Sequence, residues 1–264
     1  MRKLFVILCT FVAAAVSAAQ FRDFYVIPVA AHAPGANNTD WRTDVAIQNI
    51  QSTPVAIEMA LVESGEALSD NIQPVGTTVT VAAGQTVILR DVLNNYRGRA
   101  SASGALLVGG DKAFAITSRT YNQTPAGTLG QTVAAFGDVA TDGSDDGSTL
   151  FIPGLVQNSA FRTNLGLLMS ATSKPMTVSV MVNGATRMFT VQPGVTTHIQ
   201  FPVTSVATAP FDAAGAVVKI VDGSGTVIGY ASVVDNGTGD ASFISGGTAA
   251  AGSVQSLRLL LATR

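Results

Sequence analysis

The feature that most constrains this fold is an internal repeat, in which the second half of the chain restates the first in the same order. Ile27-Pro28 returns as Ile152-Pro153, and residues 41–47 return as residues 161–167. Further matches join 54–59 to 175–180, 80–81 to 190–191, 104–107 to 215–218, Ser118 to Ser232 and Asn122 to Asn236. The order is kept throughout, which indicates two copies of one domain of about a hundred residues each.

Each copy alternates apolar and polar residues with a period of two, which places alternate side chains on one face of a strand. Val55, Ile57 and Met59 are expected to point one way and Glu58 the other. About seven such segments occur per copy, separated by Gly, Pro, Asn and Asp residues that favour turns. We therefore predict an all-β protein of two tandem immunoglobulin-like or fibronectin-like antiparallel β-sandwich domains.

The N-terminal residues have the order of a secretory signal peptide. A basic pair precedes an apolar run over residues 4–16, and small residues follow at 17–19. We expect cleavage after Ala18 or Ala19 and export to the periplasm or the extracellular space. Cys9 lies inside this segment and is the one cysteine of the chain, so the mature protein has no thiol for a disulfide, a zinc site or a nucleophile.

The repeat also sets the domain boundaries. After the signal peptide at residues 1–19, we place the first sandwich at 20–137 and the second at 149–245, and we expect each to fold by itself. Residues 138–148 indicate an acidic linker that contains Gly and Ser. Residues 246–264 contain small residues and then an apolar tail, and the sequence leaves open whether this tail adds an edge strand, caps a domain or docks elsewhere.

The charge of the chain excludes two classes of partner. Without the signal peptide the chain has 13 basic and 17 acidic residues, whereas a nucleic-acid-binding surface needs a basic excess. No apolar stretch after the signal reaches the length of about 18 residues that a membrane-spanning helix needs. We therefore expect no nucleic-acid partner and no membrane span after signal cleavage.

The sequence contains no recognisable catalytic motif. It has two histidines, His32 and His198, and no G-x-S-x-G elbow. His198 stands at an alternating strand position, where a half-exposed structural residue is expected, and His32 lies in a loop. Paired carboxylates leave no sequence signature in a β fold, but the low acidic content argues against a glycosidase. We predict a protein that is not an enzyme and has no cofactor.

A weak calcium motif lies in the linker. Asp142, Ser144 and Asp146 take positions one, three and five of an EF-hand-like loop, with Gly147 at position six. Position twelve is Pro153 instead of the bidentate glutamate. A solvated acidic linker is therefore the preferred interpretation, and low-affinity calcium binding is the alternative.

Residues that recur in both copies are assigned to the fold. Arg42 and Arg162 occupy the same motif, so we interpret each as an internal strut that donates hydrogen bonds to loop carbonyls or a carboxylate. Trp41 matches an aromatic residue of the second copy and is expected in the core. Tyr230 matches Ile116 and is expected there too.

Residues that only the first copy has are the candidates for partner binding. Its loop from Ala31 to Trp41 is longer than the matching loop, and residues 94–99 place a tyrosine between two amides and two arginines. Tyr and Arg are common interface anchors, and a second tyrosine, at 121, stands in loop-like surroundings. Simple drift of loop sequence is the alternative. The candidate residues are His32, Asn37, Asn38, Asp40, Tyr96, Arg97, Arg99 and Tyr121.

The signal, the repeated Ile-Pro strand, the aromatic-Arg-Thr segment and the Asn-containing hairpin together resemble secreted bacterial tandem-repeat β-sandwich proteins of the immunoglobulin-like kind, whose function is unassigned. The resemblance covers nearly the whole mature chain and implies fold and export, but no activity. We therefore expect a non-catalytic structural or adhesive protein of the cell surface or periplasm, whose partner is a protein or glycan at a surface. A carbohydrate- or protein-binding module is the first alternative, and a hydrolase with an unrecognised active site is the second.

Overall fold

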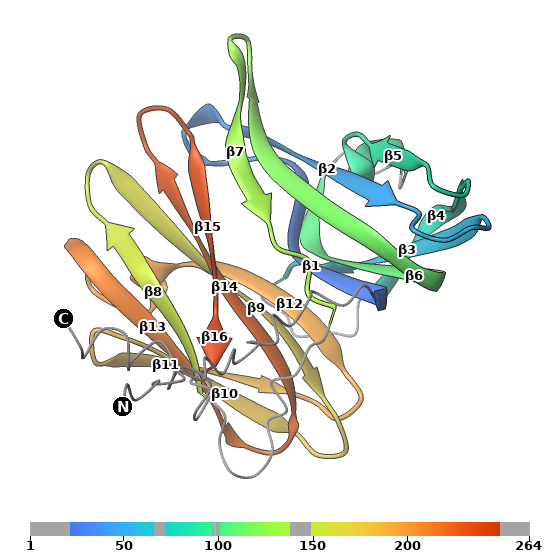
Figure 1. The fold of residues 1–264 in the computed structure, drawn as a ribbon. Coiled ribbons are helices and arrows are strands. Elements are labelled where there is room, and N and C mark those ends of the chain that lie inside the picture. Colours follow the sequence, from blue (N-terminus) through green and yellow to red (C-terminus); the bar gives the residue numbers. More distant parts are fainter. Residues whose placement is uncertain (1–21, 66–71, 97, 99–100, 138–148, 249–264) are drawn as a thin grey trace, which may run out of the picture.

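The computed structural model describes residues 22–65, 72–96, 98, 101–137 and 149–248, and in them the protein is all-β with antiparallel sheets (Figure 1). This confirms the class predicted from the period of two. Helical structure in this part is limited to three short turns, η1 (Ala36–Asn38), α1 (Val92–Asn95) and η2 (Val203–Ser205). No helix among these residues has the length and apolar character needed to cross a membrane. The expected signal peptide, the linker and the tail from residue 249 lie outside the described residues.

The first half forms one seven-stranded sheet that curves around its own core. Its strands are β1 (Arg22–Pro34), β2 (Asp40–Gln48), β3 (Val55–Glu63), β4 (Ile72–Val81), β5 (Thr86–Leu89), β6 (Ala102–Thr124) and β7 (Gly127–Val133). They run in the order β4-β3-β6-β1-β2-β5, with β7 paired to β6. The long strand β6 joins two layers, because its first part pairs with β3 and β1 and its second part pairs with β2 and β7. The core between the layers includes Ile27, Ile47, Ile57, Leu106 and Phe114.

The second half has a five-stranded and a four-stranded sheet. Its strands are β8 (Thr149–Gln157), β9 (Phe161–Ala171), β10 (Met176–Val182), β11 (Ala185–Val191), β12 (Thr196–Pro202), β13 (Phe211–Asp222), β14 (Gly225–Asp235), β15 (Ala241–Ser245) and β16 (Gly247–Thr248). The orders are β11-β10-β13-β8-β16 and β12-β9-β14-β15. Side chains from both sheets meet in a second core, which includes Ile152, Leu165, Leu167, Val178 and Phe201.

The two halves repeat one strand order. The series β4-β3-β6-β1 corresponds to β11-β10-β13-β8, and β5-β2-β6-β7 corresponds to β12-β9-β14-β15, so β6 takes the place of both β13 and β14. A shared hydrogen bond fixes the register between the copies. The backbone N–H of Ala31 donates to Oγ1 of Thr43, and that of Val156 donates to Oγ1 of Thr163.

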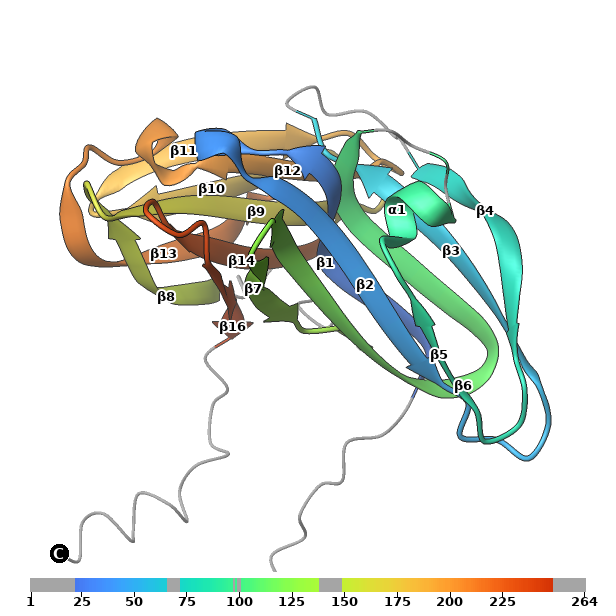
Figure 2. The same ribbon diagram turned by 90° about the horizontal axis from the view of Figure 1, so that it is seen from above.

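The halves lie side by side and pack against each other through apolar side chains (Figures 1 and 2). Val26, Val62 and Ala105 of the first half contact Leu168 and Ile228 of the second. As a result, the central parts of β12, β9 and β14 in the sheet β12-β9-β14-β15 are buried on both faces. This explains the unbroken apolar runs in β9 and β14, because a strand covered on both sides has no polar face to alternate.

Two residues on this doubly buried sheet differ from the sequence-based expectation. Tyr230 does not correspond to Ile116, because Ile116 pairs with Ile47 whereas the matching Leu167 pairs with Gly229. A shift of one residue in a strand reverses the face, so Tyr230 packs into the cluster of the first half. The expectation of a half-exposed His198 is also wrong: its exposed fraction is 0%, since the first half covers it.

Candidate functional site

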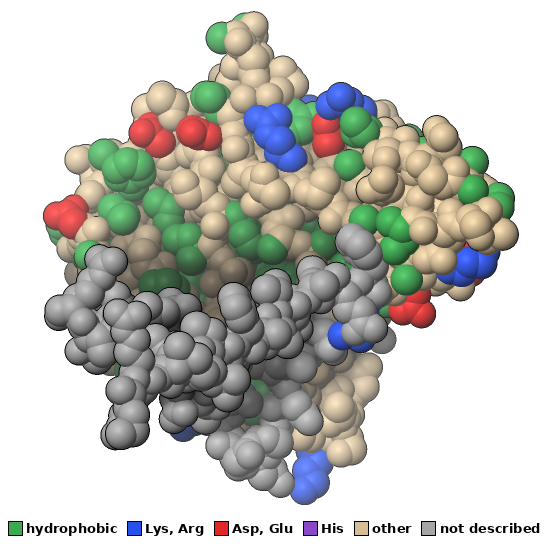
Figure 3. Space-filling model, viewed as in Figure 1, with side chains coloured by type: hydrophobic (Ala, Val, Ile, Leu, Met, Phe, Trp, Pro, Cys, Tyr) green, Lys and Arg blue, Asp and Glu red, His purple; other side chains and the backbone are tan. Residues whose placement is uncertain are grey.

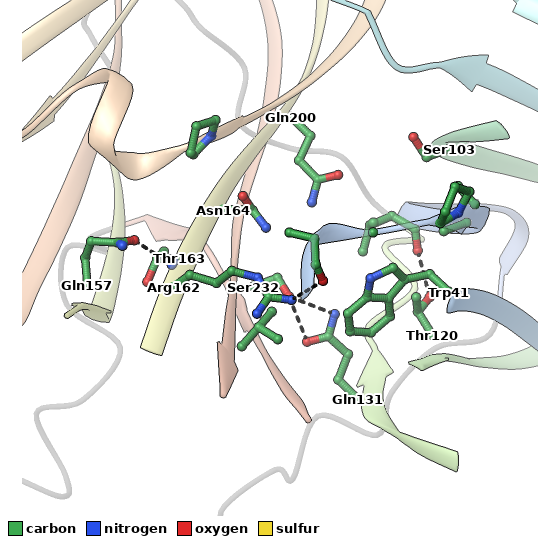
Figure 4. A pocket seen from close by; sticks show the side chains of 18 of the residues that line it. Trp41, Ser103, Thr120, Gln131, Gln157, Arg162, Thr163, Asn164, Gln200 and Ser232 are labelled. Carbon is green, nitrogen blue, oxygen red and sulfur yellow. Dashed lines mark hydrogen bonds between the residues drawn. The ribbon is translucent and has the colours of Figure 1, made fainter. Parts of the chain in front are cut away.

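A cavity of about 340 Å³ opens at the junction of the two halves, and both halves line it (Figure 4). On the face shown in Figure 3, charged side chains are scattered and form no single patch, in keeping with the 12% of charged residues in the chain. Because both halves line the cavity, it forms only where they pack together.

The first half contributes an aromatic ring. Trp41, near the start of β2, follows the same inward alternation as Thr43 and Val45, but it lies beyond the end of the core, where the cavity begins. The expectation that Trp41 is a core residue is therefore wrong. Gly35 allows the loop to approach the indole, because a Cβ at this position would overlap Nε1 and Cδ1 of the ring. Among the described residues, none accepts a hydrogen bond from the indole N–H.

The second half contributes amides, hydroxyls and one guanidinium. The amides are Gln157, Asn164 and Gln200, and the guanidinium belongs to Arg162 of β9. Nη1 of Arg162 donates to Oδ1 of Asn236 at 2.8 Å. Burial lowers the pKa of the Arg162 guanidinium, since desolvation disfavours the charged form.

One polar pair joins the halves at the cavity wall. Nε2 of Gln131 in β7 lies 3.3 Å from Oγ of Ser232 in β14, and both side chains are buried. Figure 4 shows this pair between Trp41 and Arg162, which enter the cavity from opposite halves. The described lining therefore combines an aromatic ring with many groups that can both donate and accept hydrogen bonds. It contains no carboxylate and no histidine.

Several of the sequence-predicted residues lie elsewhere, in a charged network on the first half. Nδ1 of His32 is 2.8 Å from Oδ1 of Asp91, and Nε of Arg42 is 3.4 Å from Oδ2 of the same residue. Arg42 also donates to both oxygens of Asp40 and to the carbonyl of Trp41. Arg42 thus has the contacts expected of an internal strut. The expectation that His32 lies in a loop is wrong, because it belongs to β1 and pairs with Ala102 of β6. His32 and Asp40 contact neighbouring side chains of the network, and their role in partner binding stays a prediction.

Tyr121 belongs to the edge of this network. Its hydroxyl donates to Oδ1 of Asp44 at 3.1 Å, and only 8% of the residue is exposed. Burial, together with the negative charge of Asp44, raises the pKa of the Tyr121 hydroxyl. The loop-like surroundings inferred for Tyr121 are therefore wrong, because it lies in the interior of β6.

The other candidates are separated from the network. Asn37 and Asn38 of η1 have positive φ angles, a conformation that asparagine tolerates well, and they line a second cleft of about 550 Å³ beside Asn122 and Asn236. Tyr96 packs partly buried against the first core. Two further partner candidates and the calcium candidates lie outside the described residues: Arg97, Arg99, Asp142, Ser144 and Asp146. Among the residues the structure describes, no group of three or more His, Cys, Asp or Glu side chains is placed to hold a metal ion.

The cavity could not be predicted from the sequence, because its residues come from both halves and form no local motif. Two features of the sequence nevertheless pointed to it. The unbroken apolar runs of β9 and β14 indicate that another layer covers this sheet. Arg162 is kept in the second copy, but the acidic residue that stands two positions before Arg42 is not.

Comparison with known proteins adds little to this picture. No protein-family model matches the chain, and no curated protein is detectably similar to it. Among solved structures, the chain has a weak likeness to the crystal structure of the lectin from Pleurotus ostreatus in complex with GalNAc. The identity is 12%, the match covers 88% of this chain and 84% of that one, and the TM-score is 0.18. A likeness at this level carries no argument about this chain.

Proposed function

We propose that this protein is an exported, non-catalytic saccharide-binding protein, built as two tandem antiparallel sandwiches of immunoglobulin-like architecture that hold one cavity at their junction. The signal-like N-terminus and the resemblance to secreted β-sandwich proteins support export. Binding of this kind is consistent with an adhesive role at the cell surface or in the periplasm.

The cavity at the junction is the observation that carries the proposal. Its volume of about 340 Å³ lies in the range of small-molecule sites. A sugar ring has an apolar face and a rim of hydroxyls that both donate and accept hydrogen bonds. The Trp41 ring offers an apolar surface, and the amides of Gln131, Asn164 and Gln200 offer hydrogen-bond donors and acceptors.

The same lining supports binding without catalysis. Hydrolysis of a glycosidic bond needs a pair of carboxyl groups at the scissile bond, and the described lining of the cavity has none. Acyl transfer needs a nucleophile with a base within hydrogen-bond reach. Ser103 and Ser232 line the cavity, but no histidine does.

Trp41 is the one tryptophan of the chain, so intrinsic fluorescence reports on the cavity directly. We expect the mature protein to bind one or more glycans on an array, and titration of that glycan to change the Trp41 emission. Thr204→Phe should weaken binding at least tenfold, because Thr204 lines the cavity and is itself exposed, so a larger side chain fills the cavity without disturbing the core.

Phe161→Ala provides the matched control. Phe161 occupies in β9 the position that Trp41 occupies in β2, but it does not line the cavity, so this variant should bind as the wild type does. Binding that persists unchanged in Thr204→Phe, with a wild-type melting curve, would remove the cavity as the site. A mature protein that binds no glycan on the array would contradict the proposed function.

A further inference from the structure

The cavity contains one fixed charge. Among the described residues that line it, Arg162 is the one with a charged side chain. The other polar groups of the lining are neutral amides, hydroxyls and an indole. A ligand of this site therefore meets a net positive charge on one side of an otherwise neutral wall.

The counterpart of Arg162 in the first half shows what an arginine at this position needs. Arg42 and Arg162 are one residue before Thr43 and Thr163, whose hydroxyls accept the same backbone hydrogen bond in the two copies. The positive charge of Arg42 is balanced by two carboxylates. Asp40 binds the guanidinium through both of its oxygens, and Oδ2 of Asp91 lies 3.4 Å from Nε of Arg42.

The second half has lost the first of these carboxylates. Asp40 stands two residues before Arg42, and Ala160 stands two residues before Arg162. A methyl group thus replaces the group that binds the first arginine in bidentate geometry.

The second carboxylate is lost as well. Leu89 of β5 and Phe201 of β12 are equivalent, since each pairs with the matching residue of the neighbouring strand. Two residues further on, Asp91 of the first half corresponds to Val203 of the second. The guanidinium has been kept while both of its anionic partners have been replaced by apolar residues.

The charge of Arg162 has only neutral hydrogen-bond acceptors beside it. Nη1 donates to Oδ1 of Asn236 at 2.8 Å, and Nη2 lies 3.5 Å from the carbonyl oxygen of Ala36 across the junction. The remaining N–H groups donate to no described residue. A partly desolvated cation without an anion is unfavourable, and burial accordingly lowers its pKa. A carboxylate has the planar, two-oxygen geometry that a guanidinium binds best.

We propose that the ligand of this cavity is an acidic saccharide, whose carboxylate binds Arg162 in the place that Asp40 and Asp91 take beside Arg42. The inference rests on the proposed function and narrows its ligand to sugars of the uronic acid class. The hydroxyls of the same sugar face the amides, and its ring faces Trp41.

The test compares sugars that differ only in the carboxylate. Oligomers of galacturonic acid and of galactose, and of glucuronic acid and of glucose, are titrated into the mature protein while the Trp41 emission is recorded. At least one acidic sugar should bind about tenfold or more tightly than its neutral partner, and the difference should shrink at high salt. Arg162→Gln should bring the acidic sugar to the affinity of the neutral one, and Arg162→Lys should keep part of the preference.

Lys219→Gln is the matched control, because it removes one positive charge from an exposed position of β13 in the same half, away from the cavity. It should leave the preference unchanged. Equal affinity for acidic and neutral sugars in the wild type, or a preference that survives in Arg162→Gln, would overturn the inference and leave the proposed function standing. If neither the acidic nor the neutral sugars bind, the inference fails, whereas the proposed function fails only if the glycan array also shows no binding.

Discussion

The hydroxyl of Tyr230 lies 3.0 Å from Nε2 of His198, and the two rings are stacked with their centroids 6.0 Å apart. Both side chains are completely buried between the halves. His198 belongs to β12 and Tyr230 to β14, the strands that flank β9. Gly166 of β9 lies between them, and its missing side chain leaves the space that the Tyr230 ring occupies.

This burial predicts that the protein loses stability in mild acid. Burial lowers the pKa of His198 to about 4, whereas the carbonyl of Pro28 acts weakly in the opposite direction. In the unfolded chain this histidine titrates near its ordinary value of 6.5. Between about pH 6.5 and 4 the unfolded state therefore binds more protons than the folded state, and the free energy of unfolding falls as the pH falls, by up to about 1.4 kcal/mol per pH unit.

Urea unfolding of the wild type at pH 7 and pH 5 measures this slope. His198→Gln should remove most of it, since glutamine does not titrate, even if the variant is less stable at both pH values. His32→Gln is the control, because the other histidine lies in the charged network of the first half and its replacement leaves the contribution of His198 in place. An unchanged slope in His198→Gln would show that the acid sensitivity has another source.

The space at Gly166 predicts a second effect on stability. A Cβ at this position would overlap the Tyr230 ring, which stacks against His198 and Phe243 and has no room to move. Gly166→Ala should therefore lower the free energy of unfolding by about 1–3 kcal/mol, the cost of overpacking a core. Gly215→Ala should have an effect of less than about 1 kcal/mol, because the nearest atom to its new Cβ is in ordinary contact at 3.6 Å. Equal melting temperatures for the two variants would contradict this packing.

The sequence predicted the strand-rich class because alternation within single segments is a local signal. Val55, Ile57 and Met59 are buried and Glu58 is exposed, as the period of two requires. The register between strands depends on pairing between distant segments, so it has no such local signal. Matching Tyr230 to Ile116 was wrong by one residue, which was enough to assign the ring to the wrong core.

The binding features were harder to predict, because they depend on how the two halves meet. Trp41 and Arg162 lie 121 positions apart in the chain and come together only when the doubly buried sheet packs against the first half. The predicted binding residues were instead those unique to the first copy. Two of them, His32 and Asp40, bind side chains of their own half. At the cavity, the relevant difference between the copies is that the second copy lacks the carboxylates found beside Arg42.

The two arginines of the repeat should differ in their effect on stability. Arg42→Gln leaves Asp40 and Asp91 without their cation in a partly buried site, and we expect a loss of about 1–3 kcal/mol. Arg162→Gln removes hydrogen bonds to neutral acceptors only, and the loss should stay below about 1 kcal/mol. Thermal and urea unfolding of the two variants at pH 7 gives the comparison. Equal losses would show that Arg162 is as much a structural strut as Arg42.

The apolar contact between the halves predicts how the protein unfolds. Each half has its own core, so residues 20–137 and 149–246 should each fold when expressed separately. Separation exposes Val62, Leu168, Ile228 and the Tyr230 ring. Exposure of one large apolar side chain costs about 1–3 kcal/mol of stabilising free energy. The whole protein should therefore melt in one transition, at a higher temperature than either half alone.

Ile228→Asp in the whole chain isolates this contact, because a carboxylate at the apolar junction has no partner there and both cores remain intact. We expect calorimetry of this variant to resolve two transitions near those of the separate halves. Met188→Asp should melt as the wild type does, since Met188 is 53% exposed on β11, which belongs to the other sheet of the second half. Two transitions in the wild type, at the temperatures of the isolated halves, would mean that the junction adds no stability and that the two halves are thermodynamically independent.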